Sequence, residues 1–243
     1  MNWQPPLAAE LMDVVNATWP AARQFRCGPF LLRDGQQAGK RASAATLETD
    51  LFTNNDIISA QAEMLALNQP SLFMIRNNEP ALDTALEHLG YEAFDFVTLF
   101  AAPSALLAAK DTAELHAIAS PEPLAAMAEI WAAGDIGPMR INAMLRAADP
   151  KTFYLGRTND TPAGAAFVAV HNRIAMIHAL EVAAPFRRCG LGQQIMAAAA
   201  AWALSNDSPI FALVVLSSNK AACGLYRNLG MVEAGHYHYR IKR

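Results

Sequence analysis

A loop with two glycines and two arginines is the part of this sequence best suited to chemistry. It follows a strand-like stretch, opens a helix, and contains Arg187, Arg188, Gly190 and Gly192. Glycines two positions apart let the backbone turn sharply and leave several N–H groups unpaired and pointing one way. The positive end of the helix lies behind these groups, and the arginines add charge beside them. We therefore expect an anion site suited to a pyrophosphate.

Other glycine loops make different demands on the sequence. A Rossmann dinucleotide-binding loop requires Gly-x-Gly-x-x-Gly, and the third glycine position is Ile195 here. A Walker A loop requires Gly-Lys-Ser/Thr, which this stretch lacks. The Gly-x-Gly pair alone also fits an ordinary helix start, so the interpretation depends on what surrounds it.

A second stretch, residues 219–231, places polar groups on a predicted helix. Asn219 can cap that helix, and Ala222 and Tyr226 lie four positions apart on one face. A small residue one turn before a tyrosine lets a ligand pass close to the phenol. Taken singly, Asn219 fits a helix cap and Tyr226 fits a core aromatic equally well.

Together the two stretches resemble the GNAT superfamily of N-acetyltransferases. Arg187-x-x-Gly190-x-Gly192 resembles its motif A, and residues 219–231 resemble Asn-x-x-Ala-x-x-Leu-Tyr-x-x-Leu-Gly-Phe with Met231 in the last position. The resemblance covers about residues 115–243 and is specific at the superfamily level. It implies an α/β (α+β) acyl-CoA N-acyltransferase fold, with a mixed, mostly antiparallel sheet flanked by helices. It also implies acetyl-CoA as co-substrate, no metal, and direct transfer of acetyl to a primary amine in a ternary complex.

The resemblance also assigns residues to roles. Those implied in binding coenzyme A are Leu180, Val182, Arg187, Arg188, Cys189, Gly190, Leu191, Gly192, Gln193, Asn219, Ala222 and Tyr226. Asn219 would hydrogen-bond the cofactor, and Tyr226 would protonate the departing thiolate. A backbone N–H near Val182, on a splayed strand, would polarise the thioester carbonyl.

The base that takes the ammonium proton is the least determined part of the site. Glu181 lies on the strand that carries the splay, and its carboxylate could take the proton directly or through a water. The competing role for Glu181 is an ion pair with a neighbouring arginine. Strict strand alternation puts His178 on the opposite face from Glu181, so at most one would face the acceptor.

The predicted elements that position these residues run βββ–loop–α–β–α–β. Helices are expected within residues 121–148, followed by strands at 152–156, 163–170 and 173–182 joined by short turns. A helix to about residue 204 follows the loop. The apolar run 210–216 reads as a central buried strand, and residues 231–241 as the final one.

The first half of the chain echoes this order weakly. Residues 71–101 repeat β–α–Leu-Gly–β, and aligning the Leu-Gly pairs sets Glu79 opposite Asn219 and Leu86 opposite Tyr226. Chance similarity is the alternative to duplication. With a linker at 103–114, we predict a degenerate GNAT-like domain at 1–110 and a catalytic domain at 111–243. The acceptor pocket would come from the first half and from the 121–148 helices. The aromatic and arginine-rich residues 19–30 fit a part of that pocket and an ordinary loop at the edge of the core equally well.

Amino-acid composition indicates which other kinds of protein this chain could be. The chain has 243 residues, of which 53% are hydrophobic, ample for a buried core. Its three cysteines, an odd count without metal-type spacing, predict reduced thiols, and His236 with His238 lacks a third metal ligand. Lacking a signal-like or membrane-spanning stretch, it is expected to be cytoplasmic.

Charge also separates the two ends of the chain. From Glu181 onward, seven basic residues face three acidic ones, although the whole chain carries −3. A local positive segment suits a compact anionic ligand, so neither a nucleic acid nor a membrane is expected as partner. A homodimer is compatible with the sequence. Two further hypotheses stay open: a non-catalytic acyl-CoA sensor or interaction module on the same fold, and an acceptor that is a hydroxyl or a protein lysine.

Overall fold

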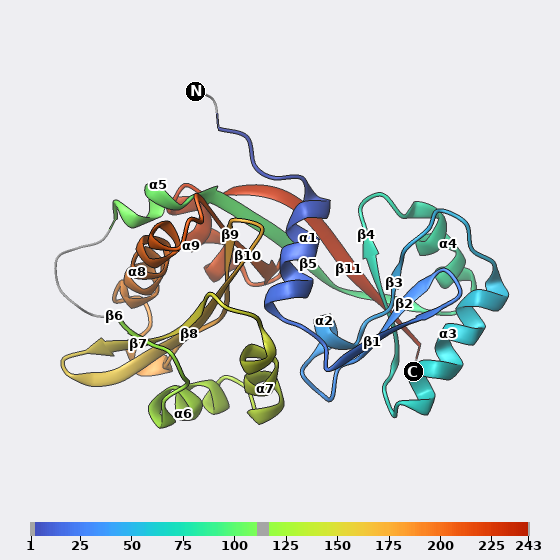
Figure 1. Cartoon of the computed structure of the whole chain (residues 1–243), viewed down its shortest axis with the longest axis horizontal. Coiled ribbons are helices and arrows are strands. Elements are labelled where there is room, and N and C mark those ends of the chain that lie inside the picture. The colour runs from blue at the N-terminus through green and yellow to red at the C-terminus, as the bar shows by residue number, and fades with distance from the viewer. Residues whose placement is uncertain (1–2, 111–116, 243) are drawn as a thin grey trace.

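The computed structural model describes residues 3–110 and 117–242 (Figure 1). Its strands are β1 (Arg23–Cys27), β2 (Phe30–Asp34), β3 (Thr46–Leu47), β4 (Ser71–Arg76), β5 (Glu92–Pro103), β6 (Ala117–Ser120), β7 (Lys151–Thr158), β8 (Thr161–His171), β9 (Ile174–Val182), β10 (Ile210–Leu216) and β11 (Val232–Lys242). Its α-helices are α1 (Ala8–Thr18), α2 (Lys40–Ser43), α3 (Asn54–Ala66), α4 (Pro80–His88), α5 (Ser104–Ala108), α6 (Ala125–Ala133), α7 (Pro138–Arg146), α8 (Leu191–Ser205) and α9 (Lys220–Asn228). A short 3-10 helix, η1, covers Ala184–Phe186.

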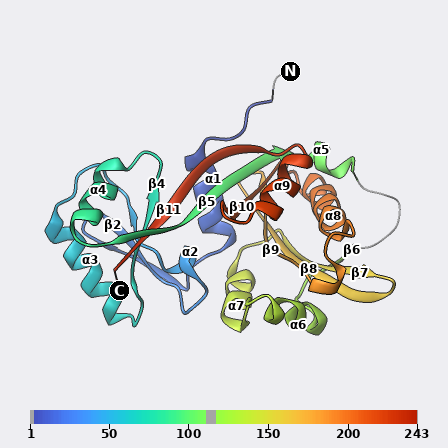
Figure 2. The same ribbon diagram turned by 180° about the vertical axis from the view of Figure 1, so that it is seen from behind.

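Eight strands form the main sheet, in the order β4-β11-β5-β10-β9-β8-β7-β6. All neighbouring pairs in it are antiparallel except β9 and β10, which run parallel. Strands β1, β2 and β3 form a separate small antiparallel sheet. Figure 2 shows the long strands β5 and β11 running together across the molecule and connecting its two ends. The predicted mixed, mostly antiparallel α/β fold is confirmed.

The predicted element order of the second half is also confirmed. Strands β7, β8 and β9 form a meander, and its two turns place Asn159, Asp160, Asn172 and Arg173 at positive φ, as tight hairpin turns require. Apolar β10 is a central strand between β5 and β9, which explains why it lacks alternation.

The expected linker at 103–114 is wrong for the part of it that the structure describes. Pro103 ends β5, and α5 follows at once, with Leu107 buried in the core that also holds α8. The small and polar residues of this stretch suggested a linker, but its alanines and leucines form a helix that packs on the core. The rest of that stretch, residues 111–116, lies outside the described residues.

The first half repeats the order of the second. Three antiparallel strands β1–β3 are followed by α3, β4, α4 and β5, as β7–β9 are followed by α8, β10, α9 and β11. A single parallel bridge, Ala45 to Phe73, connects the β3 end to β4, where the second half has the parallel pair β9–β10. The two Leu-Gly turns match as well, because Gly90 and Gly230 both adopt positive φ.

The pairing of β5 with β11 relates the halves by an approximate twofold axis. With residue n of the first half matched to n + 140 of the second, Val97 pairs with its own counterpart, Tyr237. Under the same match, Glu92 corresponds to Val232 and Ala101 to Ile241, so the observed pairs Val232–Ala101 and Ile241–Glu92 are equivalent to each other. Each half therefore places its last strand beside the next-to-last strand of the other, β11 beside β4 and β5 beside β10.

Helices cover both faces of the main sheet. Helices α5, α8 and α9 share one apolar core, whereas α1 packs on the opposite face in another, and α6 and α7 close a third over β7 to β9. Gly156 and Gly164, paired across β7 and β8, let α8 approach closely, because a Cβ on either would come within 3 Å of Ile195 Cδ1. No helix in the described residues is long and apolar enough to cross a membrane.

Candidate active site

The centre of the candidate site is a gap that opens between β9 and β10. The two strands pair only from Ile174–Ile210 to Ile177–Leu213. Beyond that point β9 follows β8 as far as Val182, and β10 follows β5 as far as Leu216. Backbone groups on the facing edges therefore lack a ladder partner across the gap. The resemblance to the GNAT superfamily implied a splayed strand near Val182, and β9 and β10 separate on the way to that residue.

A backbone irregularity on β9 marks the start of the gap. The β8–β9 register shifts between the pairs Phe167–His178 and Ala165–Glu181, and the extra residue, Ala179, has φ +51°. The indole of Trp131 donates a hydrogen bond to the Ala179 carbonyl at 2.8 Å. The irregularity is a β-bulge held by α6, not a frayed end.

The glycine loop lies at one mouth of the gap. Gly190 is the N-cap of α8 in the left-handed region, φ +86°, and Arg188 has φ +65°. No side chain caps α8, so N–H groups of its first turn are available to an anion. The Arg187 guanidinium donates to the Val182 carbonyl at 2.8 Å and forms an ion pair with Glu181 at 2.9 Å.

The second motif lies directly against this loop. Gly192 faces Leu225 of α9 and Val182 of β9, both within 4 Å of the position its Cβ would take. The structure thus brings the two motifs together. Leu191 is different from the other predicted contacts: its side chain is buried in the core, so only its backbone can face a ligand.

Asn219 and Tyr226 take the positions that their helix dictates. The Asn219 side-chain oxygen accepts from the Ala222 N–H at 3.1 Å, so it is the N-cap of α9, and its amide N–H groups remain to donate. The Tyr226 ring is buried against Phe100. Burial, with Cys223 adding a smaller effect, raises the pKa of Tyr226 to about 12. Its phenol is therefore protonated at neutral pH.

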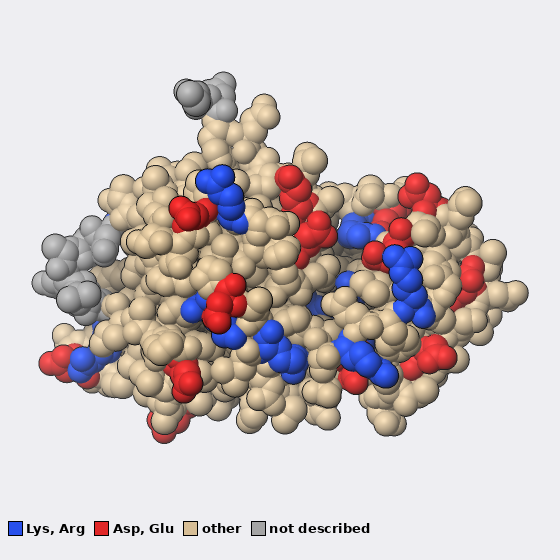
Figure 3. Space-filling model, in the orientation of Figure 1, with Lys and Arg blue, Asp and Glu red and all other residues tan. Residues whose placement is uncertain are grey.

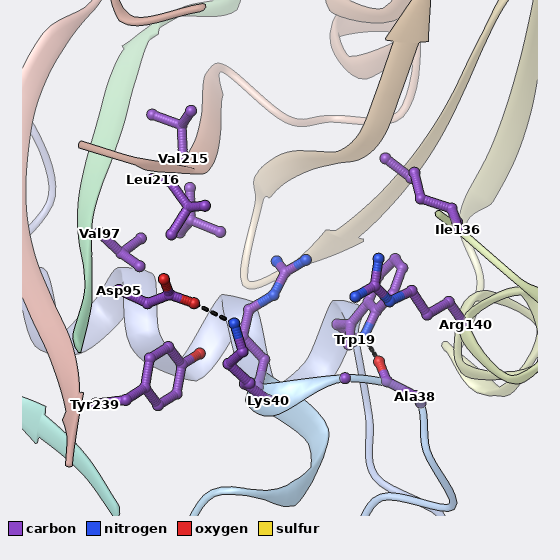
Figure 4. A pocket seen from close by; sticks show the side chains of 14 residues that line it. Trp19, Ala38, Lys40, Asp95, Val97, Ile136, Arg140, Val215, Leu216 and Tyr239 are labelled. Carbon is purple, nitrogen blue, oxygen red and sulfur yellow. Dashed lines mark hydrogen bonds and ion pairs between the residues drawn. The ribbon is translucent and has the colours of Figure 1, made fainter. Parts of the chain in front are cut away.

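A cavity of about 220 Å³ reaches the same gap from the other face of the sheet (Figure 4). It is lined by Trp19, Ala38, Gly39, Lys40, Arg41, Asp95, Val97, Ile136, Arg140, Ala179, Val214, Val215, Leu216 and Tyr239. Ala179, Val214, Val215 and Leu216 belong to the splayed strands and Tyr239 to β11, whereas the other lining residues come from the first half and the α6–α7 region. The two regions expected to form an acceptor pocket both contribute to this cavity, and Trp19 is the member of residues 19–30 that lines it.

Charged groups are concentrated in this cavity. Lys40 forms an ion pair with Asp95, and Arg140 donates to the Asp135 carbonyl at 3.0 Å. Arg41 stacks on the Trp19 ring, with its guanidinium carbon 4.8 Å from the ring centre. The outer surface differs, since acidic and basic side chains are interspersed on the face shown in Figure 3.

Arg41 is fixed from behind by a buried histidine. Its guanidinium lies 3.0 Å from His178 Nδ1, and His178 Nε2 lies 2.7 Å from the Thr18 hydroxyl. That hydroxyl donates to the Val14 carbonyl, so it accepts from Nε2–H, and Nδ1 is left to accept from Arg41. Burial, and then Arg41, hold the pKa of His178 well below its ordinary value. The imidazole is neutral and acts as an acceptor for Arg41.

The expectation that His178 and Glu181 face opposite sides of β9 is wrong. Their partners, Phe167 and Ala165, are two residues apart on β8 and so share a face. The bulge at Ala179 inserts the extra residue that breaks the alternation. Both side chains therefore point toward the α6 side, where Glu181 lies against Gly134.

Sequence reasoning missed the charged residues of the cavity. Lys40, Arg41 and Asp95 lie in the first half, far from either motif, and Arg140 lies on α7. Lys40 and Arg41 are neighbours in the sequence but belong to no recognisable motif, and neither do Asp95 and Arg140, so only the fold shows that the four residues surround one cavity.

The corresponding loop of the first half has the opposite chemistry. The connection from β3 to α3 contains Glu48 and Asp50 and has no glycine. The α3 N-terminus is closed by a capping box in which Thr53 and Asp56 bond each other's backbone N–H groups. The N–H groups at the start of α3 are therefore already bonded, and the acidic side chains of the loop repel an anion.

The described residues contain no group of three or more His, Cys, Asp or Glu side chains placed to hold a metal ion. Their three cysteines are unpaired thiols: Cys27 is half-buried, Cys189 exposed and Cys223 buried.

Comparisons with known proteins agree with this geometry. The model of the acetyltransferase (GNAT) family matches residues 109–231. The uncharacterised N-acetyltransferase YobR of Bacillus subtilis is 27% identical over 235 residues, which cover 93% of this chain and 95% of YobR.

Solved structures share the fold. A GCN5-related N-acetyltransferase from Kribbella flavida has a TM-score of 0.71 at 18% identity, covering 98% of this chain and 96% of that one. A tandem GNAT protein from the clavulanic acid biosynthesis pathway has a TM-score of 0.61 at 12% identity, covering 99% and 89%.

A splayed parallel strand pair beside an uncapped, arginine-flanked helix start defines an acyltransferase-type fold. The chain belongs to the acetyltransferase (GNAT) family.

Proposed function

We propose that this protein is an acetyl-CoA-dependent N-acetyltransferase that transfers acetyl to a primary amine of a small molecule or peptide in a ternary complex. The observation that carries the proposal is the gap between β9 and β10, which meets the anion loop on one side and a charged cavity on the other. Donor and acceptor can therefore meet inside the sheet, as direct transfer requires. We expect it to act in the cytoplasm.

The donor side has the features that a coenzyme A pyrophosphate needs. The first turn of α8 supplies backbone N–H groups, Gly190 and Arg188 provide the left-handed backbone, and Arg187 supplies positive charge. Free N–H groups on β9 near Val182 and the Asn219 amide would then hold the pantetheine arm. When bound, acetyl-CoA supplies the activated acyl group.

Two side chains would move protons. Tyr226, protonated at neutral pH, would donate to the departing thiolate. Glu181 would accept the proton of the acceptor ammonium. Its ion pair with Arg187 orients the carboxylate on the cavity side of β9, so it can reach the acceptor only if the acceptor enters from that face.

The chemistry would belong to the second half. We propose that residues 1–110 form a degenerate GNAT-like domain and residues 111–243 the catalytic one, joined by exchange of their last strands. The repeated element order, the symmetric β5–β11 register and the acidic, capped loop before α3 support this division.

Calorimetric titration with acetyl-CoA and coenzyme A tests the donor site. We expect one binding site per chain, and thiol release when an amine acceptor is added. Absence of binding by either ligand would overturn the proposal. Binding with no thiol release over a broad amine panel would favour an acyl-CoA sensor instead.

A further inference from the structure

Resting on the proposed function, we propose that the acceptor is a small amine that also carries an anionic group, a carboxylate or phosphate, held by Arg41 and Arg140. Both arginines line the cavity that reaches the gap between β9 and β10. The proposal defines one end of the acceptor by charge and leaves the amine end to meet the thioester.

The charge balance of the cavity calls for an anion. Among the described residues neither Arg41 nor Arg140 forms an ion pair with a carboxylate, and the cavity's acidic residue, Asp95, is paired with Lys40. A half-buried guanidinium without a counter-ion is costly, and a bidentate carboxylate or phosphate compensates for it.

The arginines are held in place before any ligand arrives. Arg41 is fixed by His178 Nδ1 and by the Trp19 ring, and Arg140 by the Asp135 carbonyl. Each of these partners is neutral, so they orient the guanidinium without neutralising it. Arg140 Nε lies 3.4 Å from the position that a Cβ on Gly39 would take, and Figure 4 shows the Arg140 side chain entering the cavity from the side opposite the Lys40–Asp95 pair. Such preorganisation favours a specific anion over solvent.

The dimensions of the cavity favour a small acceptor. About 220 Å³ is below the 300–1,000 Å³ or so of pockets for drug-sized ligands. Ile136, Val215 and Leu216 provide an apolar wall, and Ala179 and Val214 mark the edge nearest the gap. A compact molecule with an anion at one end and an amine at the other fits this distribution.

Matched acceptors test the proposal. We would follow thiol release from acetyl-CoA with the protein amino acids, β-alanine and 2-aminoethyl phosphate. Each would be compared with its neutral counterpart: the amino acid amide, the decarboxylated amine or ethanolamine. We expect kcat/KM to be at least tenfold higher for the best anionic amine than for its neutral counterpart. Comparing 2-aminoethyl phosphate with the carboxylate-bearing amines shows which of the two anions the site prefers.

Variants then assign the preference to the arginines. Arg140→Gln and Arg41→Lys should raise KM for the anionic acceptor at least tenfold and change the rate with its neutral counterpart less than threefold. The lysine variant keeps charge but loses the guanidinium fork. Arg157→Gln, which removes a surface ion pair with Asp160 outside the cavity, is the control and should change neither. Thermal unfolding confirms that each variant is folded.

Two results would overturn the inference and leave the proposed function standing: acetylation of neutral or cationic amines without preference for an anion, or arginine variants that impair both members of a pair equally. Failure of the protein to bind acetyl-CoA would instead overturn the proposed function. The titration separates these cases before any acceptor is tested.

Discussion

At the scale of single residues, the role of the Tyr226 hydroxyl as proton donor can be tested most directly. Tyr226→Phe removes the proton donor but keeps the ring, so we expect kcat to fall about 100-fold with acetyl-CoA affinity nearly unchanged. Because the pKa is raised to about 12, no loss of activity below pH 11 should come from this phenol. Tyr154→Phe is the matched control, since that buried hydroxyl donates to the Ala198 carbonyl in the core. Equal rates for the two variants would remove Tyr226 from the role.

Glu181 is tested by the pH dependence of the rate. If its carboxylate is the base, Glu181→Gln should lower kcat about 100-fold and abolish the acidic limb of the pH–rate profile. Glu233→Gln breaks a comparable ion pair, with Arg227, on β11, which borders neither β9 nor β10, and should leave the profile intact. An unchanged profile in the Glu181 variant would show that this carboxylate only pairs with Arg187.

How far the sequence predicts the site depends on how local each interaction is. The anion loop and the α9 motif were predictable because spacing along one strand or helix determines which backbone N–H groups and which face they present. Arg41 and Arg140 were not, because nothing near them in the sequence indicates that α2 and α7 meet at one cavity.

At the scale of elements, the start of α8 controls donor binding. Gly190→Ala places a side chain at φ +86°, which costs about 1–2 kcal/mol, and shifts the N–H groups of the first turn. We expect acetyl-CoA affinity to fall about tenfold or more by calorimetry. Gly137→Ala changes the N-cap glycine of α7, where φ is −82° and the site is open, so it should have no effect. Equal affinities in both variants would contradict an α8 anion site.

The bulge on β9 changes which face of the sheet its later side chains occupy. Alternation predicts the faces of a regular strand correctly, yet one added residue, Ala179, reverses every assignment beyond it. The sequence holds no turn residue at this position. Its cause is tertiary, since Trp131 of α6 binds the displaced carbonyl.

At the scale of the whole molecule, His178 connects folding to pH. The folded protein holds the pKa of this imidazole well below 6.5, whereas the unfolded chain takes up a proton near pH 6.5. The free energy of unfolding should therefore be largest above pH 6.5 and fall with pH below it, by at most about 1.4 kcal/mol per unit from this group.

Denaturant unfolding at pH 7.5 and 5.5 measures this dependence. His178→Gln should reduce the difference between the two pH values, whatever its effect on stability itself. His236→Gln, a change at an exposed imidazole, should leave the difference unchanged. A His178 variant with the same pH dependence as the parent would contradict the assignment.

The exchanged strands make the two halves interdependent. A chain of residues 111–243 would lack β5, which lies between β10 and β11 in the intact sheet. We expect this fragment to be unfolded by circular dichroism and unable to bind acetyl-CoA, and supplying residues 1–110 should restore binding. A fragment that binds acetyl-CoA alone would show that the second half is self-sufficient.

The same register has a consequence for biosynthesis. Strand β11 is the partner of both β4 and β5, so the first half cannot complete its sheet until β11 has been synthesised. Until then β4 and one edge of β5 are exposed to other nascent chains, a state prone to aggregation. The two halves are thus expected to fold together as one cooperative unit, and the yield of folded protein to depend on how long that edge is shielded.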